Sequence, residues 1–179
     1  DDLLACGAAV TVVAPRIDAA FDREGVTCLR AAYEAAHLDD AALVFACTDD
    51  AALNAQIVAD ARGRNILACA VDQPADCDFF SPAITRDGDV VVAIGTGGAA
   101  PGLAGQLRDG LAEHLPEQIG DFADALQACR TIVRDRIEDP ARRKTILTAL
   151  ANSDMYAAFL SGGPDAIHAA MDAMLATES

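Results

Sequence analysis

The sequence has few aromatic and few basic residues. Its 179 residues include no tryptophan and only 4% aromatic side chains, and Lys144 is the single lysine. Lysine and arginine together number 13 against 28 aspartates and glutamates, which gives a formal net charge of −15. A protein of this charge repels nucleic acid and anionic membranes, so we expect neither as a partner.

Long apolar runs and targeting signals are also missing. The apolar run over residues 3–15 is too short to span a bilayer and is interrupted by Gly7. The sequence opens with two aspartates, without the basic segment of a secretion signal and without an initiating methionine. We therefore expect no membrane segment, and we expect the sequence to belong to a longer product.

Cysteine pairs with metal-binding spacing are absent. The six cysteines include no Cys-x-x-Cys pair and lie mostly in apolar runs, which favours buried reduced thiols over disulfides or a zinc site. Reduced thiols are typical of the cytoplasm. The three histidines, His37, His114 and His168, lie in unrelated segments, so we predict no metal site.

The first part of the chain alternates short β-type runs with helix-type runs. The expected strands cover residues 10–14, 26–29, 43–47 and 66–71, and such alternation is typical of a parallel sheet flanked by helices. Between the last two strands, Asp50 offers a capping carboxylate and Gly63 a helix end, which predicts a helix. The predicted fold class is therefore α/β.

Beyond residue 72 the pattern changes to a hairpin followed by helices. Asp87-Gly88 is a hairpin turn signal between β-type runs, and apolar residues recur every three or four positions after Pro101. Pro140 is expected to start one helix, and residues 162–164, Gly-Gly-Pro, to separate the last two. The last third is predicted to be a small helical domain.

A glycine-rich loop at residues 95–100 fits the dinucleotide pattern G-x-G-x-x-A. Residues 117–137 are helical in pattern, however, so no second strand completes a βαβ unit. Two interpretations stay open: backbone N–H groups that hold carboxylates or phosphate, or a plain turn. The opening strand and glycine loop of a doubly wound domain are expected to precede residues 3–7, which have the pattern of a helix end.

Four stretches of the chain resemble one known family. They are LLxxGAxVTVVAP at residues 3–15, VFACTDD with Leu53 and Asn54 at residues 44–54, VD with Phe79 and Pro82 at residues 71–82, and VAIGTGG with Pro101 at residues 92–101. In this order and spacing they resemble the precorrin-2 dehydrogenase and sirohydrochlorin ferrochelatase family, the N-terminal module of sirohaem synthase. The resemblance covers most of the chain and is loose over the last helices.

The resemblance implies a fold and an activity. The fold would be a Rossmann-like NAD-binding domain over residues 1–88, a dimerisation segment over residues 89–116 and a helical domain over residues 117–179, in a cytoplasmic homodimer. Members of the family are oxidoreductases that use NAD to convert precorrin-2 to sirohydrochlorin in sirohaem and cobalamin (porphyrin-type) biosynthesis. Some also insert ferrous iron, a ferrochelatase (lyase) activity that yields sirohaem.

The resemblance also implies a site, residue by residue. Asp72 matches the family's catalytic aspartate, and Thr96, with Gly97 and Gly98, matches the loop near the tetrapyrrole. The family's nucleotide contacts match the following positions: Pro15, Arg16, Thr48, Asp49 and Asn54. The second strand ends without an acidic residue for a ribose hydroxyl, so the preference for NAD rests on the resemblance alone.

Several alternatives stay open. Without the resemblance, Asp72 would be an ordinary turn aspartate before Pro74. The cations within residues 130–144 form either a patch for substrate carboxylates or a solvated helix face that pairs with neighbouring acids. The chain as a whole is the dehydrogenase, a catalytically inactive nucleotide-binding and dimerisation module, or an unrelated Rossmann-type regulatory subunit.

Overall fold

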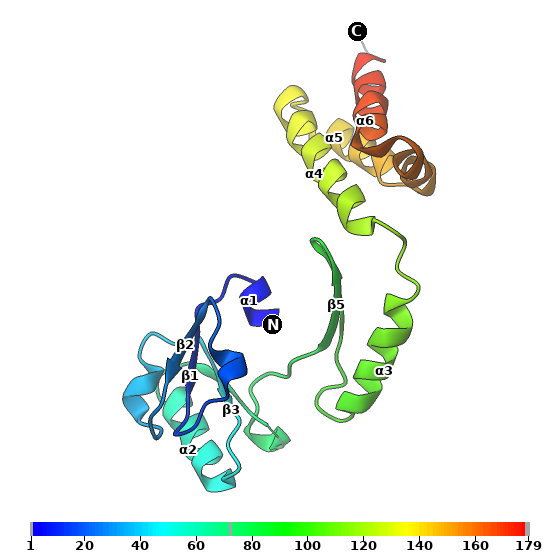
Figure 1. Cartoon of the computed structure of the whole chain (residues 1–179). Coiled ribbons are helices and arrows are strands. Elements are labelled where there is room, and N and C mark those ends of the chain that lie inside the picture. Colours follow the sequence, from blue (N-terminus) through cyan, green and yellow to red (C-terminus); the bar gives the residue numbers. More distant parts are fainter. Residues whose placement is uncertain (1, 72, 178–179) are drawn as a thin grey trace. The chain divides into compact units, whose positions relative to one another are not determined.

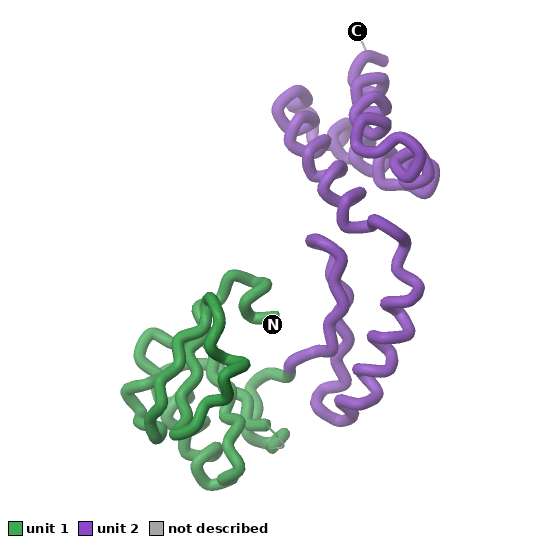
Figure 2. The backbone as a smooth tube through the Cα atoms, in the orientation of Figure 1, with its two compact units in different colours: residues 1–80 green, residues 81–179 purple. Residues whose placement is uncertain are grey.

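A computed structural model describes residues 2–71 and 73–177 of the chain. The chain divides into two units, residues 1–80 and 81–179 (Figure 2). Each unit has its own apolar core.

Unit 1 combines short helices with parallel strands (Figure 1). Its elements are, in chain order, α1 (Asp2–Ala5), β1 (Val10–Val13), the 3-10 helix η1 (Ala19–Phe21), β2 (Val26–Leu29), η2 (Ala35–Leu38), β3 (Leu43–Ala46), α2 (Ala51–Arg62), β4 (Leu67–Ala70) and η3 (Pro74–Asp76). The four predicted strands are confirmed, with ends that differ by at most one residue.

The strands of unit 1 form two parallel pairs. β1 pairs with β2 from Val10 opposite Val26, and β3 pairs with β4 up to Ala46 opposite Ala70. The described residues place these pairs in separate two-stranded sheets. In the doubly wound strand order, a further strand lies between two such pairs. No residue within 2–71 or 73–177 supplies that strand.

Helix α2 is fixed by its ends and by its apolar face. The Asp50 carboxylate accepts the N–H groups of Ala52 and Leu53 at 2.9 and 3.2 Å, and Gly63 follows the last turn, as predicted. Val58 and Ala61 on the inner face are 1% and 0% exposed. The unit 1 core is rich in alanine, which lets the helix approach β3 and β4 closely. Its buried members are Leu38, Ala46, Ile57, Val58, Ala61, Ile66, Ala68 and Ala70.

Unit 2 begins with a hairpin and a helix. β5 (Ala83–Asp87) and β6 (Val90–Ile94) are antiparallel, and Gly88 in the turn between them has a φ of 54°. The hairpin predicted from Asp87-Gly88 is therefore confirmed. α3 (Pro101–Ala112) packs on both strands. Because the strands pair along their whole length, the hairpin lies entirely in unit 2, and the unit boundary falls after residue 80, earlier than the expected boundary after residue 88.

Three further helices complete unit 2: α4 (Ile119–Arg136), α5 (Pro140–Leu150) and α6 (Ser153–Ala176). Pro140 is the first residue of α5, as predicted, and Asp139 caps that helix. The predicted break before Pro164 is also confirmed, because Gly163 has a non-helical φ of 63° inside α6. No helix formed by residues 2–71 and 73–177 is long and apolar enough to cross a membrane.

The apolar stripes predicted for these helices meet in one core. On α4, Cys129 and Val133 are fully buried, and the Phe122 ring lies edge-on to Tyr156 and tilted to Phe159, with both ring centroids 5.3 Å away. The buried members of this core are Phe122, Ala125, Cys129, Val133, Ile146, Leu150, Phe159, Ile167 and Met171. Packing of this kind stabilises unit 2 independently of the sheets.

The hairpin and α4 approach each other closely at two glycines. The Gly120 N–H donates to the Asp87 carboxylate at 3.0 Å, and a Cβ atom on Gly88 would lie 3.2 Å from the Gly120 Cα. A Cβ atom on Gly120 would lie only 2.6 Å from the Asp87 carbonyl oxygen. The hairpin and α4 can therefore come this close only because Gly120 has no side chain.

Replacing Gly120 with alanine is expected to lower the free energy of unfolding by about 1–3 kcal/mol, because the added methyl group must displace backbone. Thermal unfolding measures the effect. Gly110→Ala is the matched control, since an added methyl group there meets nothing within 4 Å. The control is expected to stabilise helix α3 by about 0.5–1 kcal/mol. Equal melting temperatures for Gly120→Ala and the unchanged protein would contradict the proposed constraint.

Candidate functional site

The predicted nucleotide contacts lie where the strands of unit 1 end. Pro15 and Arg16 follow β1 and are exposed, and Thr48 and Asp49 follow β3 and are also exposed. The carboxyl ends of paired parallel strands meet at one edge of the sheet, which is where open α/β sheets bind ligands. Asp72, the predicted catalytic residue, lies outside the described residues.

Thr48 and Asn54 form a closed set of hydrogen bonds. Asn54 is 3% exposed, and its Oδ1 accepts the Thr48 N–H at 3.0 Å and the Thr48 hydroxyl at 2.7 Å. Its Nδ2 donates to the Thr48 carbonyl at 3.1 Å. Asn54 therefore lies under the loop after β3 and fixes its shape, while Thr48 and Asp49 form the exposed part of the same loop.

The segment after β4 is tied to the same loop. The Val71 N–H donates to the Ala46 carbonyl at 3.0 Å, which continues the pairing of β4 with β3. The Gln73 Nε2 donates to the Ala51 carbonyl, at the start of α2, at 3.3 Å. These two bonds flank position 72 in the sequence, so the neighbours of Asp72 lie beside the Thr48 loop. No local pattern predicts the role of Gln73, because its bond joins two segments 22 residues apart.

Asp78 holds the far end of that segment. Its N–H donates to the Ala68 carbonyl at 2.8 Å, and its carboxylate accepts the Ala68 N–H at 3.0 Å. Arg62 donates to the same carboxylate through Nε at 3.0 Å and Nη2 at 2.8 Å. The hydrogen bond from Arg62 lowers the pKa of Asp78, with a further contribution from the Ala68 N–H. Asp78 is thus a structural carboxylate that holds residues 77–78 against β4.

The cysteines are free thiols in different environments. Cys69 and Cys129 are buried, Cys28 and Cys77 are half-buried, and Cys6 and Cys47 are exposed. Burial raises the pKa of Cys129. Among the described residues, no group of three or more histidine, cysteine, aspartate or glutamate side chains could hold a metal ion.

The predicted tetrapyrrole loop lies in unit 2, between β6 and α3. Gly97 and Gly98 have φ values of 61° and 79°, which explains why glycine occupies both positions. The Thr96 hydroxyl accepts the Ala100 N–H at 3.2 Å, just before α3 begins. The hydroxyl proton of Thr96 stays available for a ligand. Since β6 pairs antiparallel with β5, this loop does not belong to a βαβ unit.

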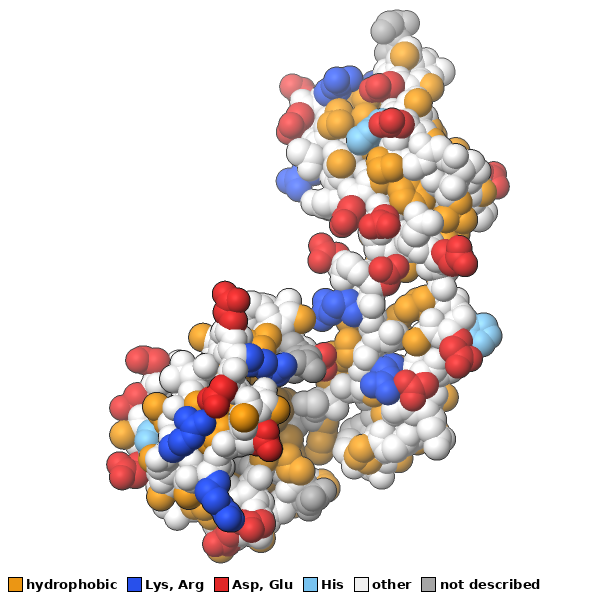
Figure 3. Space-filling model, in the orientation of Figure 1, with side chains coloured by type: hydrophobic (Ala, Val, Ile, Leu, Met, Phe, Trp, Pro, Cys, Tyr) orange, Lys and Arg blue, Asp and Glu red, His pale blue; other side chains and the backbone are white. Residues whose placement is uncertain are grey.

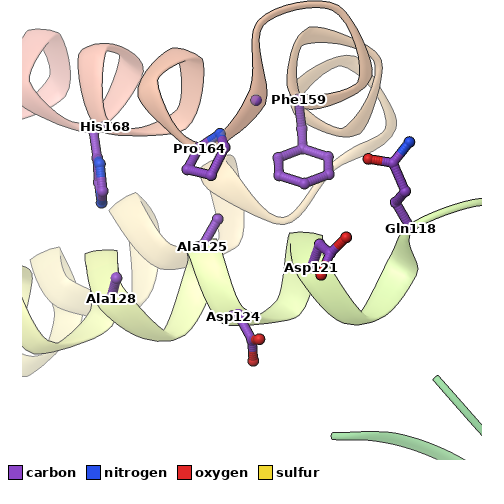
Figure 4. Close-up of a pocket in the computed structure, with 9 residues that line it drawn as sticks. Gln118, Asp121, Asp124, Ala125, Ala128, Phe159, Pro164 and His168 are labelled. Atoms are coloured by element: carbon purple, nitrogen blue, oxygen red, sulfur yellow. The ribbon is translucent and has the colours of Figure 1, made fainter. Parts of the chain in front are cut away.

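A separate groove lies between α4 and α6. Its volume is about 420 Å³, and its lining residues are Gln118, Asp121, Asp124, Ala125, Ala128, Phe159, Gly163, Pro164 and His168. Phe159, Pro164 and His168 project from α6 toward α4, whereas the Asp124 carboxylate points away from α6 (Figure 4). The buried Nε2 of His168 has no hydrogen-bond partner within the described part of the chain.

Two of the basic residues within residues 130–144 have partners inside the helical part. Arg136 lies 3.7 Å from the Asp172 carboxylate, and the Arg143 Nη1 donates to the Ile137 carbonyl at 3.3 Å. These contacts agree with the interpretation of a solvated helix face, although Arg136 pairs with α6 and not with the adjacent acids. Acidic side chains are spread over both units on the face shown in Figure 3.

Two protein families match the chain in succession. Residues 1–83 match the family described as "Putative NAD(P)-binding", and residues 118–175 match the family described as "Sirohaem synthase dimerisation region". The first match covers the whole of unit 1, and the second covers helices α4–α6. The second match therefore lies beyond residues 89–116, for which the dimerisation segment was expected.

Curated relatives are similar over most of this chain. The siroheme synthase of Methylococcus capsulatus is 38% identical over 146 residues, which cover 79% of this chain and 31% of the relative. The siroheme synthase of Methylobacillus flagellatus is 34% identical over 173 residues, which cover 94% of this chain and 37% of the relative. The chain thus spans about a third of the length of the curated relatives it matches.

A solved structure has the same fold. The structure titled "SirC, precorrin-2 dehydrogenase" superposes with a TM-score of 0.74 at 21% sequence identity, covering 96% of this chain and 86% of the other. The predicted fold class, an α/β unit followed by a helical part, is confirmed.

The hydrogen bonds of Asn54 predict a measurable role. Asn54→Ala is expected to lower the free energy of unfolding by about 1–3 kcal/mol, because it leaves the Thr48 N–H and carbonyl without their partner. Urea unfolding measures this change. Gln56→Ala, at an exposed position of the same helix, is the control and is expected to stay within about 0.5 kcal/mol. A loss of equal size in both variants would assign the effect to the helix and not to the loop.

Proposed function

We propose that the chain is an NAD-dependent precorrin-2 dehydrogenase of the family of sirohaem synthase N-terminal modules. The observation that carries this proposal is the succession of the two matches, an NAD(P)-binding family over residues 1–83 and a sirohaem synthase region over residues 118–175. The proposed reaction is the oxidation of precorrin-2 to sirohydrochlorin in the cytoplasm.

The residues at the strand ends fit a nicotinamide dinucleotide. Pro15 and Arg16 are exposed at the carboxyl end of β1, and Thr48 and Asp49 at the carboxyl end of β3, which are positions where α/β sheets bind such ligands. Buried Asn54 gives the Thr48 loop a defined shape before a ligand arrives. Pro15 and Arg16 would contact the nucleotide after β1, and Thr48 and Asp49 after β3. We assign Asn54 the role of a positioning residue, since its amide is engaged by Thr48.

The oxidation removes a hydride and a proton from the tetrapyrrole. NAD, when bound, supplies the hydride acceptor. We assign Asp72 the role of the base that takes the proton, because in the sequence it follows β4, whose end pairs with the end of β3 beside the Thr48 loop. Gln73 and Asp78, on either side of η3, would hold the chain around this carboxylate in place through their bonds to Ala51 and Ala68.

The substrate carries many carboxylates, and the protein is strongly acidic. The loop of Thr96, Gly97 and Gly98 offers uncharged donors at the start of α3, where backbone N–H groups and the helix dipole favour anions. We assign this loop to a substrate carboxylate, with the Thr96 hydroxyl as one of the donors. The Thr96 hydroxyl oxygen accepts the Ala100 N–H, so the hydroxyl proton points away from Ala100.

We propose that two copies of the chain form a homodimer through unit 2. Leu103, Leu107 and Leu111 recur at every fourth position of α3 and are 51%, 47% and 48% exposed. A stripe of this kind lies on one face of a helix, and its exposure to water is unfavourable. A second copy of the same surface would bury it.

The role of Asp72 is tested by Asp72→Asn, which keeps the size of the side chain but removes the proton acceptor. We expect kcat for precorrin-2 oxidation to fall by about 10²–10⁴-fold, with NAD affinity unchanged. The measurement is anaerobic formation of sirohydrochlorin, followed by absorbance, together with a titration of NAD binding.

Asp76→Asn is the matched control, because Asp76 is the neighbouring acid in η3 and is expected to leave turnover unchanged. Equal turnover in Asp72→Asn and the unchanged protein would remove Asp72 from the reaction. Binding of NAD and tetrapyrrole without turnover in any form of the protein would favour the inactive module instead.

The dimer is tested by Leu107→Glu, which places a charge within the leucine stripe. We expect the sedimenting mass to fall from two chains to one, because burying a leucine contributes about 1.5–3 kcal/mol and a buried unpaired charge is costly. Gln106→Glu, at the adjacent exposed position, is the control and is expected to leave the dimer intact. A single-chain mass for the unchanged protein would overturn the proposal.

A further inference from the structure

Two thiols meet at the end of β4. The sulfur atoms of Cys69, on β4, and Cys77, just after η3, are 3.3 Å apart. Cys77 also donates to the Ala70 carbonyl at 3.1 Å, so its sulfur points toward the strand while the residue stays half-buried at the surface. A disulfide bond is about 2 Å long, so a small rotation of these side chains would bring the sulfur atoms within bonding distance.

The backbone holds the two cysteines in this arrangement. The N–H and the carboxylate of Asp78 are both bonded to Ala68, and Arg62 holds that carboxylate in turn. Ala68 and Asp78 each adjoin one member of the pair. These bonds do not involve sulfur, and they hold the backbone on both sides of the contact between the thiols.

The two thiols differ in access. Cys69 is 9% exposed, whereas Cys77 is half-buried. Burial and the hydrogen bond with Cys77 raise the pKa of Cys69 to about 11, so Cys69 is a neutral thiol at pH 7. An oxidant from solvent would meet Cys77 first, and Cys69 would be the second thiol to react. Such an order is typical of a pair in which one sulfur is oxidised and its neighbour resolves the product.

We propose that Cys69 and Cys77 are an oxidisable dithiol that a peroxide converts to an intramolecular disulfide. The Cys77 sulfur attacks one oxygen of hydrogen peroxide, the O–O bond breaks, and one water leaves, which gives a sulfenic acid. The Cys69 sulfur then attacks the Cys77 sulfur, the S–O bond breaks, and the hydroxyl group leaves as water with the Cys69 proton. The two thiols lose two electrons in total and the peroxide gains them.

The disulfide would close a ring around the segment that follows β4. That segment includes position 72, three residues after Cys69 and five before Cys77. Closing the ring restrains the backbone on both sides of Asp72. Formation of the bond does not depend on the proposed function, whereas its effect on turnover rests on the assignment of Asp72 as the base.

Mass spectrometry tests the bond directly. The full chain is treated with hydrogen peroxide, remaining thiols are blocked, and peptides are mapped without reduction. We expect a peptide that links Cys69 to Cys77, a loss of two hydrogen masses from the intact protein, and recovery of both thiols after treatment with dithiothreitol. The proposal would be overturned if the disulfide involved Cys47. It would also be overturned if Cys69 and Cys77 both carried the blocking group after peroxide treatment, because neither thiol would then have been oxidised.

Variants separate the pair from the other cysteines. Cys77→Ser and Cys77→Ala should both abolish the link, and Cys28→Ser, at a half-buried thiol on β2, should leave it unchanged. Turnover of precorrin-2 is measured on the same samples. We expect a reversible loss of turnover in the unchanged protein and in Cys28→Ser, but not in the Cys77 variants. A complete link with full turnover would contradict the restraint on Asp72 and leave the dithiol itself established.

Discussion

The parallel pairing of β3 with β4 is the constraint on which the rest of unit 1 depends. It places Ala46 opposite Ala70 and so brings the two loops that leave these strands to one edge. The apolar core beneath is small and rich in alanine, which limits what hydrophobic burial can contribute. The loops are held by hydrogen bonds that involve Asn54, Gln73 and Asp78, and not by the packing of bulky side chains.

Unit 2 reaches its stability by a different route. Its helices bury large side chains, with Leu150, Ile167 and Met171 almost fully removed from water. The hairpin joins this core through Gly120, where backbone meets backbone without a side chain between them. The glycine-rich loop at residues 95–100, to which we assign a substrate carboxylate, connects two elements, β6 and α3, that are each packed. A loop between packed elements can present its donors in a fixed geometry, which favours binding.

Local signals made most of the elements predictable. Asp50 and Gly63 delimit α2, and Asp87-Gly88 predicts the hairpin, because capping and turn chemistry act over a few residues. The contacts between Arg62 and Asp78, 16 residues apart, and between Cys69 and Cys77 were not predictable. They form only once β4 and η3 lie side by side, and no periodicity in the sequence encodes that arrangement. The assignments of Asp72 and of Thr96 stay predictions, carried by family resemblance.

The charge of the protein limits how it could hold the acidic tetrapyrrole that we propose as its substrate. The protein has a formal net charge of −15, so it repels a substrate with many carboxylates at long range. Only local hydrogen-bond donors can offset this repulsion. Arg136 and Arg143 are already engaged by Asp172 and by the Ile137 carbonyl, so their charge is partly committed to the helices. Backbone N–H groups add no net charge and lose no side-chain entropy on binding. This argument supports the proposed role of the glycine-rich loop before α3, and the two positive φ angles at Gly97 and Gly98 give that loop its shape.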